Sequence, residues 1–205
     1  MYGILISLGI LLCVIYVEKI LKSDLVWMAG FWSILFGIVG ARAYHVIHYL
    51  EFYLADPIKI VQLTNGGLGI IGGFLFGFMA LFIYLKIKGE DVLRWLDVIV
   101  IPLPLAQALG RIGNLFNNEL VEYAIGEIIF CLILFLTNYK ISKSGKLKKG
   151  SVFAVYLIGY SIIRVFLEFT RQSYWQIYGV SVAQAFSAVI MIVSICLISY
   201  LNYSK

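Results

Sequence analysis

Residues 66–85 have the sequence GGLGIIGGFLFGFMALFIYL, which contains no charged side chain and is followed by Lys86 and Lys88. An α-helix needs about 20 apolar residues to cross the hydrocarbon core of a bilayer. This stretch has that length, so we predict a membrane-spanning helix here. The composition extends the argument to the whole chain, since 62% of its residues are hydrophobic and only 13% are charged, against about 25% charged in soluble domains.

Six more apolar runs accompany this one, at residues 2–17, 25–49, 95–109, 124–137, 152–169 and 179–200. We therefore predict an all-α polytopic membrane protein with about seven transmembrane helices, in which residues 1–205 form a single transmembrane domain. Pro102 and Pro104 lie in the run at 95–109, and proline removes a backbone hydrogen-bond donor, so a kinked or broken helix is expected there. The run at 124–137 predicts a short helix.

The distribution of basic residues predicts the topology. Of the 16 Lys and Arg residues, 11 fall on the connections of one side and three, Lys59, Arg111 and Arg171, on the other. Cytoplasmic loops carry the excess of Lys and Arg. The N-terminus is therefore expected outside and the C-terminus in the cytoplasm, in the plasma (cytoplasmic) membrane.

The predicted topology assigns two loops to opposite sides of the membrane. Residues 139–150 are expected in the cytoplasm and residues 171–179 outside. Tyr174, Trp175 and Tyr178 in the outer loop are typical of an interfacial aromatic belt.

Several ionisable side chains fall within or beside the predicted spans, where each costs about 2.5–3.5 kcal/mol on insertion scales. The topology brings all of them, with Tyr2 at the start of the first span, toward the outer leaflet. They are Arg42, Arg111, Glu119, Glu127, Arg164 and Glu168. Their convergence predicts a site that faces the outer leaflet.

The sixth span carries Tyr160, Arg164, Glu168 and Arg171 on one helical face, because their spacings are four, four and three. Arg164 and Glu168 are therefore able to pair. A structural ion pair explains these two residues as well as a binding site does.

Residues 110–119, GRIGNLFNNE, place Arg111 and Asn114 three residues apart, and the polar residues 117–119 crowd around them. If Arg111 only forms an ion pair, Glu119 is the expected partner, but a single ion pair does not require so many polar groups. The planar guanidinium of arginine binds phosphate through two hydrogen bonds and stays charged. The phosphate most available at this depth belongs to a phospholipid.

Residues 65–73, NGGLGIIGG, contain five glycines, which permit close approach of a helix or of a lipid head group. We expect no room for a side chain at four of them, Gly66, Gly67, Gly72 and Gly73. His45 and His48 have only Glu51 as a nearby further ligand, so hydrogen-bonded histidines are favoured over a metal site.

Four segments resemble the prolipoprotein diacylglyceryl transferase family. They are GRIGNLFNNEL at 110–120, LIGYSIIRVFLEFTRQ at 157–172, the glycine segment at 65–73 and Tyr2-Gly3; GARAY at 40–44 and ADP at 55–57 also match. The resemblance covers nearly the whole chain. The family has seven transmembrane helices with the N-terminus outside, in agreement with the basic-residue count.

The resemblance implies transfer of a diacylglyceryl group from phosphatidylglycerol to the lipobox cysteine in a prolipoprotein signal peptide. A thioether forms and glycerol phosphate leaves. No cofactor, metal or nucleic acid is implied. The implied catalytic residues are Arg111, Asn114, Glu119, Arg164 and Glu168, and the implied substrate-binding residues are Tyr2, Arg42, Gly66, Gly67, Gly72, Gly73 and Tyr160.

The chain departs from the family in three places, one of which is the glycine that normally follows the 110–120 segment and is replaced around Glu122. Ile71 stands where the family has a histidine. Only residues 121–123 separate the 110–120 segment from the fifth span, where the family has a periplasmic head and an H-P-S-Q-type motif; Glu127 alone remains of that motif. Glu119, Glu168 or His48 could then serve as base, or no base is needed because the arginines lower the pKa of the thiol. A relative with another acceptor, or a non-catalytic lipid-binding protein, is the alternative.

Overall fold

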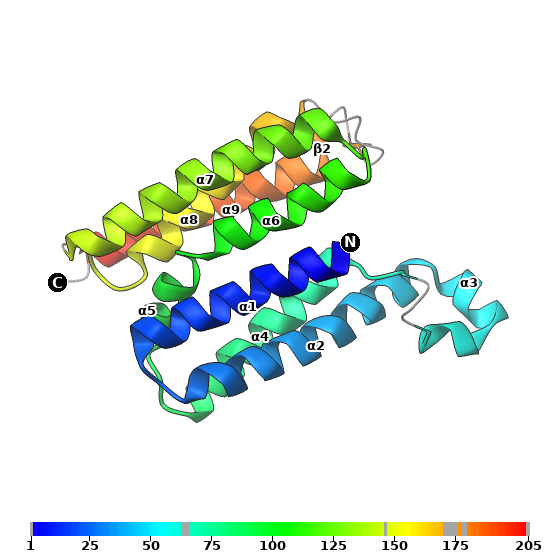
Figure 1. Ribbon diagram of the computed structural model, residues 1–205, viewed down its shortest axis with the longest axis horizontal. Coiled ribbons are helices and arrows are strands. Elements are labelled where there is room, and N and C mark those ends of the chain that lie inside the picture. The colour runs from blue at the N-terminus through cyan, green and yellow to red at the C-terminus, as the bar shows by residue number, and fades with distance from the viewer. Residues whose placement is uncertain (1, 63–65, 146, 170–175, 178–179, 204–205) are drawn as a thin grey trace. The chain divides into compact units, whose positions relative to one another are not determined.

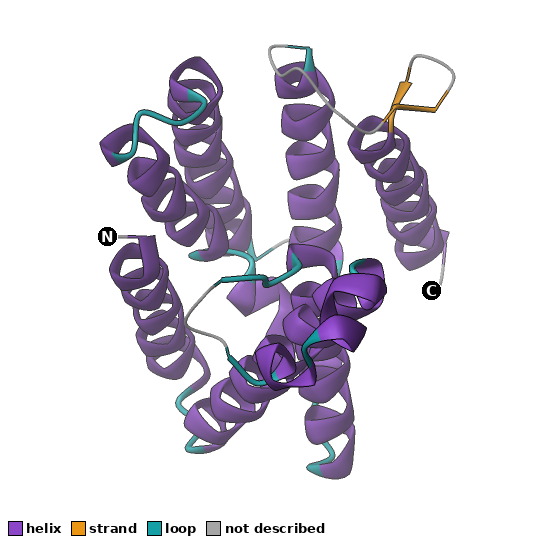
Figure 2. Cartoon of the chain, turned by 90° about the vertical axis from the view of Figure 1, so that its right-hand side faces the viewer, coloured by secondary structure: helices purple, strands orange, loops and turns teal. Residues whose placement is uncertain are grey.

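The computed structural model describes residues 2–62, 66–145, 147–169, 176–177 and 180–203, most of which are helical (Figure 1). The helices are α1 (Tyr2–Leu21), α2 (Leu25–His48), α3 (Leu50–Ala55), the 3-10 helix η1 (Pro57–Ile60), α4 (Ile70–Ile87), α5 (Val92–Ile99), α6 (Leu103–Phe116), α7 (Val121–Ser144), α8 (Ser151–Glu168) and α9 (Val182–Tyr203). Two short antiparallel strands, β1 (Gln176–Ile177) and β2 (Val180–Ser181), precede α9 (Figure 2).

Within the described residues, six helices are long and apolar enough to cross a membrane, and α5 with α6 makes a seventh span if the bent pair counts as one. The two helices meet at an angle of 44°. Pro102 and Pro104 lie at this break, which confirms the predicted interruption. The all-α polytopic class is confirmed, whereas the orientation of the termini stays a prediction.

Helix α7 is longer than its apolar run indicates, because it continues from Val121 to Ser144. Its last two turns include Lys140 and Lys143. A helix does not have to end where hydrophobicity ends, since polar residues in its last turns extend beyond the hydrocarbon core. The prediction of a short fifth span is therefore wrong.

The spanning helices expose much of their apolar surface. Ile4, Phe74 and Phe166 are 75%, 68% and 68% exposed, respectively. Monomeric soluble proteins rarely expose contiguous apolar patches of this extent, whereas lipid tails are as apolar as these side chains. The chain is a multi-pass membrane protein.

The chain forms two compact units, a first unit of residues 1–21 and 93–205 and a second unit of residues 22–92. The expectation of one transmembrane domain stays a prediction. In the first unit, α6 contacts α7, α7 contacts α8, α8 contacts α9, and α1 packs on α6. Helices α7, α8 and α9 lie side by side (Figure 1).

Asp97 on α5 caps the start of α8. Its Oδ2 accepts a hydrogen bond from the Gly150 amide at 2.6 Å, and its Oδ1 accepts one from the Phe153 amide at 2.8 Å. The first amides of a helix have no intrahelical acceptor, and a carboxylate there also complements the helix dipole. Asp97 therefore holds the first turn of α8, which is the cytoplasmic end of that helix under the predicted topology.

In the second unit, α2 and α4 pack with small residues between them. The Gly69 amide donates to the Ala41 carbonyl at 2.9 Å, and the Ser33 hydroxyl donates to the Gly77 carbonyl at 2.9 Å. A Cβ atom added to Gly72 would overlap the Gly40 carbonyl. Small side chains thus let the two backbones come into direct contact.

Candidate active site

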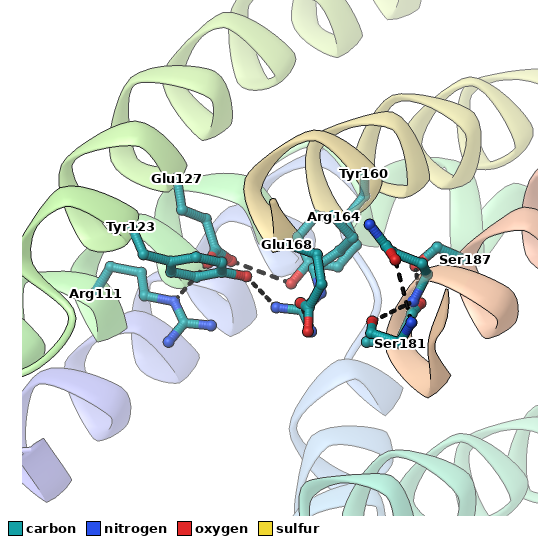
Figure 3. A network of polar contacts seen from close by, with 10 residues as sticks. Arg111, Tyr123, Glu127, Tyr160, Arg164, Glu168, Ser181 and Ser187 are labelled. Atoms are coloured by element: carbon teal, nitrogen blue, oxygen red, sulfur yellow. Dashed lines mark hydrogen bonds and ion pairs between the residues drawn. The ribbon is translucent and has the colours of Figure 1, made fainter. Parts of the chain in front are cut away.

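Three helices of the first unit bring six polar side chains together (Figure 3). We call this group the arginine–tyrosine cluster. Its members are Arg111 on α6, Tyr123 and Glu127 on α7, and Tyr160, Arg164 and Glu168 on α8. Helix α7 begins shortly after α6 ends, and α8 returns alongside α7, so the end of α6, the start of α7 and the end of α8 meet.

Arg111 forms the first half of the cluster with Glu127. Its Nε lies 2.7 Å from the Glu127 Oε2. The Tyr160 hydroxyl donates a hydrogen bond to the Glu127 Oε1 at 3.2 Å. Glu127 is 1% exposed, and its Oε2 accepts no well-directed hydrogen bond from the described residues. Glu127 is therefore a buried carboxylate that depends on one arginine for its counter-charge.

Arg164 forms the second half with Glu168. Its NH2 lies 3.5 Å from the Glu168 Oε2, and its NH1 donates to the Tyr123 hydroxyl. The ion pair predicted from the spacing of four is confirmed. Glu168 is buried, and its Oε2 also lacks a hydrogen bond within the described part of the chain.

Both arginines converge on Tyr123. The guanidinium carbon of Arg111 lies 5.3 Å from the centroid of the Tyr123 ring, and that of Arg164 lies 5.8 Å from it. The ring lies between the two guanidinium groups (Figure 3). The two arginines thus lie near one ring, but each has its own carboxylate partner, and a phosphate site shared by them stays a prediction.

The partner of Arg111 differs from the one considered from the sequence. If each arginine had its own carboxylate, Glu119 was the expected partner, but the structure pairs Arg111 with Glu127. Glu119 is exposed and follows the end of α6, and its amide donates to the Asn114 carbonyl at 2.9 Å. The helix ends at Phe116, which turns Glu119 out of the cluster.

Asn114 is buried, and its side-chain Oδ1 has no hydrogen-bond partner among the described residues. The catalytic roles of Asn114 and Glu119 stay predictions. Tyr123 was not assigned to the site from the sequence, and Glu127 was counted among the converging charged groups without a catalytic or binding role. Their spacing of four on α7, which repeats the spacing of Tyr160, Arg164 and Glu168 on α8, is a signal that could have found them.

Arg42 has a different environment, in the second unit. It is 8% exposed, and its guanidinium donates five hydrogen bonds to backbone carbonyls, an arrangement we call the carbonyl clasp. Nε donates to Ile60 at 2.9 Å, NH1 to Gly66 at 2.7 Å and Gly67 at 2.9 Å, and NH2 to Gln62 at 3.0 Å and also to Lys59. Guanidinium has five N–H donors. The clasp therefore occupies all five donors of Arg42, and its role in substrate binding stays a prediction.

The glycine segment follows the clasp. Gly66 and Gly67 both have φ of +79°. A Cβ atom on Gly67 would lie 2.6 Å from the Arg42 NH1, whereas one on Gly66 would meet nothing within 4 Å. Gly72 and Gly73 lie against α2. The expected lack of room is confirmed at Gly67 and Gly72, while Gly73 is packed tightly, 3.3 Å from the Ala41 Cβ for an added Cβ atom. The expectation is wrong at Gly66, where the backbone conformation is what favours glycine.

The two histidines, Tyr2 and the outer loop remain to be placed among the residues singled out from the sequence. The His45 Nδ1 shares a hydrogen bond of 3.0 Å with the Tyr53 hydroxyl, and the His48 ring stacks on Tyr44. Tyr2 begins α1, but its side chain is outside the described part of the structure. The predicted aromatic belt and Arg171 also lie outside the described residues.

Known proteins resemble this chain over nearly its whole length. The profile of the family described as prolipoprotein diacylglyceryl transferase matches residues 1–123 and 120–200. A phosphatidylglycerol–prolipoprotein diacylglyceryl transferase of Clostridium perfringens is 32% identical over 95% of this chain and 87% of its own length. The corresponding protein of Finegoldia magna is 30% identical over 100% of this chain and 91% of its own length, and one from Clostridium botulinum (strain Langeland) is 32% identical over 95% and 89%.

The alignment with the C. perfringens protein has 233 positions, more than the 205 residues of this chain, so that relative carries additional residues. The two segments matched by the family profile meet at residues 120–123. This is the place where the sequence lacks the outer head expected from the resemblance. With matches that cover nearly all of its length, the chain belongs to the prolipoprotein diacylglyceryl transferase family.

Proposed function

We propose that this chain transfers the diacylglyceryl group of phosphatidylglycerol to the lipobox cysteine of a prolipoprotein, at the outer leaflet of the plasma membrane. Membership of the family supports the reaction, because the matched relatives are named for both substrates. The low number of basic residues in the predicted outer connections supports the leaflet.

The observation that carries the proposal is the convergence of Arg111 and Arg164 on Tyr123. The two arginines come from helices that are far apart in the sequence, and both are largely buried. Preorganised cations are most effective at the place where negative charge develops in the transition state. The developing charge in this reaction is on the phosphate of the leaving group.

The reaction requires a thiolate. The lipobox thiol loses its proton, and its sulfur attacks the glyceryl carbon that carries the phosphate ester. The bond between this carbon and the ester oxygen breaks with its electrons going to the oxygen. Diacylglyceryl thioether and glycerol phosphate are the products, and the thiol proton balances the charge on the phosphate. Arg111 and Arg164 would bind the phosphate oxygens during bond breaking.

Glu127 is the proton acceptor that the geometry favours. Its carboxylate is buried, and its Oε2 relies on Arg111 alone. When a phosphate oxygen takes over the Arg111 guanidinium, Glu127 is free to accept the thiol proton. This would supply the base at a site where Ile71 replaces the family histidine. Glu168 has a similar environment beside Arg164 and is the second candidate.

The alternatives from the sequence, another acceptor or a non-catalytic lipid-binding protein, have less support. A lipid-binding scaffold has little need for two buried ion pairs joined by a tyrosine, since each ionised group is expensive in a membrane. No outer head is present between residues 120 and 123. This difference affects how the acceptor protein is bound, and it leaves the groups that act on the phospholipid in place.

The test uses the purified protein in nanodiscs that contain phosphatidylglycerol with a labelled head group. Labelled glycerol phosphate should appear when a lipobox peptide is added, and the peptide should gain the mass of one diacylglyceryl group. A Cys→Ser peptide is the matched control. Release with the serine peptide, or no release with the cysteine peptide, would reject the proposal.

A further inference from the structure

A second polar layer adjoins the arginine–tyrosine cluster on the same three helices of the first unit. We call it the uncharged layer. Its members are Gln107 on α6, Cys131 on α7 and Tyr156 on α8. Each is four residues from a member of the cluster, which is Arg111, Glu127 and Tyr160, respectively. Residues four apart are neighbours on one face of a helix, so the layer lies one turn from the cluster on each helix.

The members of the uncharged layer contact one another. The Gln107 Nε2 donates a hydrogen bond to the Tyr156 hydroxyl at 2.8 Å, and the Cys131 Sγ lies 4.0 Å from the Gln107 Oε1. Tyr156 and Cys131 are buried. A side-chain amide without a hydrogen bond is costly in an apolar setting, and hydrogen bonds between helices stabilise their packing. Packing accounts for this hydrogen bond by itself, so a role in the reaction depends on what else Tyr156 contacts.

Tyr156 connects the uncharged layer to the cluster. Its ring stacks on the Tyr160 ring, with the centroids 6.0 Å apart and an angle of 12° between the planes. The Tyr160 hydroxyl in turn donates to the Glu127 Oε1 at 3.2 Å (Figure 3). The contacts therefore run from Gln107 through two tyrosine rings to the carboxylate that pairs with Arg111.

The hydrogen bond from Tyr160 to Glu127 is long. Hydrogen bonds from a hydroxyl to a carboxylate are about 2.5–2.7 Å, whereas this one measures 3.2 Å. Such a bond holds the Tyr160 ring weakly, so the ring depends on its packing for its position. A small rotation of the ring would remove a donor from Glu127, whose carboxylate is buried.

We propose that Gln107 and Tyr156 are positioning residues for the transfer reaction. The hydrogen bond between them fixes the Tyr156 ring, and this ring holds Tyr160. The Tyr160 hydroxyl then keeps the Glu127 carboxylate beside Arg111, where it accepts the thiol proton. Gln107 and Tyr156 act through Tyr160 and are not catalytic residues. This inference rests on the proposed function, in which Glu127 is the proton acceptor.

The first experiment measures the kcat of two variants in nanodiscs with the lipobox peptide. Tyr156→Phe removes only the hydroxyl and keeps the ring, and Gln107→Leu removes the donor. Each should lower kcat about two- to tenfold, because one hydrogen bond is lost. The KM for phosphatidylglycerol should change less than about twofold, since the arginines stay in place. Tyr156→Phe carries the test if Gln107→Leu does not fold.

Tyr16→Phe is the matched control. Tyr16 on α1 packs against the same apolar core as Tyr156, and the variant also loses one hydroxyl. It should keep the kcat of the wild type. An equal fall of kcat in Tyr16→Phe and Tyr156→Phe, or a higher KM with unchanged kcat in Tyr156→Phe, overturns the positioning role.

The double variant Gln107→Leu/Tyr156→Phe tests whether the two residues act through their shared hydrogen bond. Its kcat should be no lower than that of the slower single variant, because both substitutions remove the same interaction. Effects that multiply would show two independent contributions and overturn the proposed chain of contacts.

A change of acceptor separates positioning of the base from general damage to the structure. A selenol is a stronger acid than a thiol and is ionised at neutral pH, so a lipobox peptide with selenocysteine in place of cysteine needs no proton acceptor. With this peptide, Tyr156→Phe and Gln107→Leu should fall short of the wild type by less than about twofold, because the base no longer contributes. A defect of the same size with both peptides overturns the proposal.

The cysteine peptide separates this inference from the proposed function. If the wild type transfers diacylglyceryl to it and selenocysteine does not restore the variants, the proposed function stands and the positioning role fails. If the wild type transfers nothing to the cysteine peptide, the proposed function fails, and the positioning role fails with it.

Discussion

Two regions of this protein place arginine in an apolar setting, and they neutralise it in different ways. In the arginine–tyrosine cluster, Arg111 and Arg164 each have a carboxylate partner. In the carbonyl clasp, Arg42 donates five hydrogen bonds to backbone carbonyls, those of Lys59, Ile60, Gln62, Gly66 and Gly67. The three side chains are chemically identical, so their surroundings must account for any difference in function.

The comparison teaches what to expect of a buried arginine. A carboxylate is an anion, so a phosphate can replace it on the guanidinium without leaving the cation unpaired. A backbone carbonyl belongs to the chain, and removing it from the guanidinium would leave a buried acceptor unsatisfied. We therefore infer that Arg111 and Arg164 are suited to binding a substrate, whereas Arg42 is suited to holding a loop.

The largest expected effect is on turnover in the cluster. Arg111→Lys and Arg164→Lys each replace a planar guanidinium, which can form two parallel hydrogen bonds to phosphate, by an ammonium group. Loss of a charge-assisted contact worth about 1.5–3 kcal/mol should lower glycerol phosphate release by roughly ten- to hundredfold. Release is measured in nanodiscs with a saturating lipobox peptide. Arg94→Lys, outside both regions, is the control, and an equal small effect in all three variants would remove the functional distinction.

The second largest expected effect concerns the carbonyl clasp. Arg42→Lys replaces five donors by three and leaves carbonyls of the clasp without partners. Each orphaned acceptor costs about 1–3 kcal/mol, so the local opening of this segment should become easier by about 2 kcal/mol. Hydrogen exchange of the amides of residues 66–69 measures the opening. If exchange is unchanged while the KM for phosphatidylglycerol rises, Arg42 contacts the lipid directly and the clasp is not its role.

The sequence predicts the membrane class and the convergence of charged groups, because both depend on coarse features. Apolar runs of span length and the break at Pro102 and Pro104 follow from local chemistry. The meeting of Arg111 with Arg164 follows from topology, which places both near the same end of their helices. These predictions need no knowledge of which side chain points where.

The choice of partners could not be predicted in the same way. Glu119 is closer to Arg111 in the sequence than Glu127, but helix α6 ends at Phe116 and the chain turns before Glu119. The clasp of Arg42 depends on backbone carbonyls that point toward its guanidinium. Every residue has a backbone carbonyl, so the sequence does not show which of them accept its hydrogen bonds. Partner selection by a buried arginine is therefore decided by tertiary structure.

Helix packing in the second unit gives a smaller effect on stability. Gly72→Ala places a methyl group against the Gly40 carbonyl, and overpacking of this kind costs about 1–3 kcal/mol. Gly110→Ala is the matched control within α6, because a Cβ atom there meets nothing within 4 Å. Thermal unfolding in detergent should be lowered only for Gly72→Ala. If both variants unfold like the wild type, the close contact of α2 and α4 does not limit stability, and the loop held by Arg42 is less constrained than proposed.

The smallest expected effect concerns the hydroxyl of Tyr123. Tyr123→Phe keeps the ring near both guanidinium groups and removes only the oxygen that accepts a hydrogen bond from Arg164. A hydrogen bond of this kind contributes about 0.5–1.5 kcal/mol, so turnover should fall about two- to tenfold. Tyr123→Leu also removes the aromatic face and should have the larger effect. If Tyr123→Phe is as inactive as Arg164→Lys, the hydroxyl takes part in the chemistry. If Tyr123→Phe equals the wild type while Tyr123→Leu is impaired, the ring alone separates and orients the two arginines.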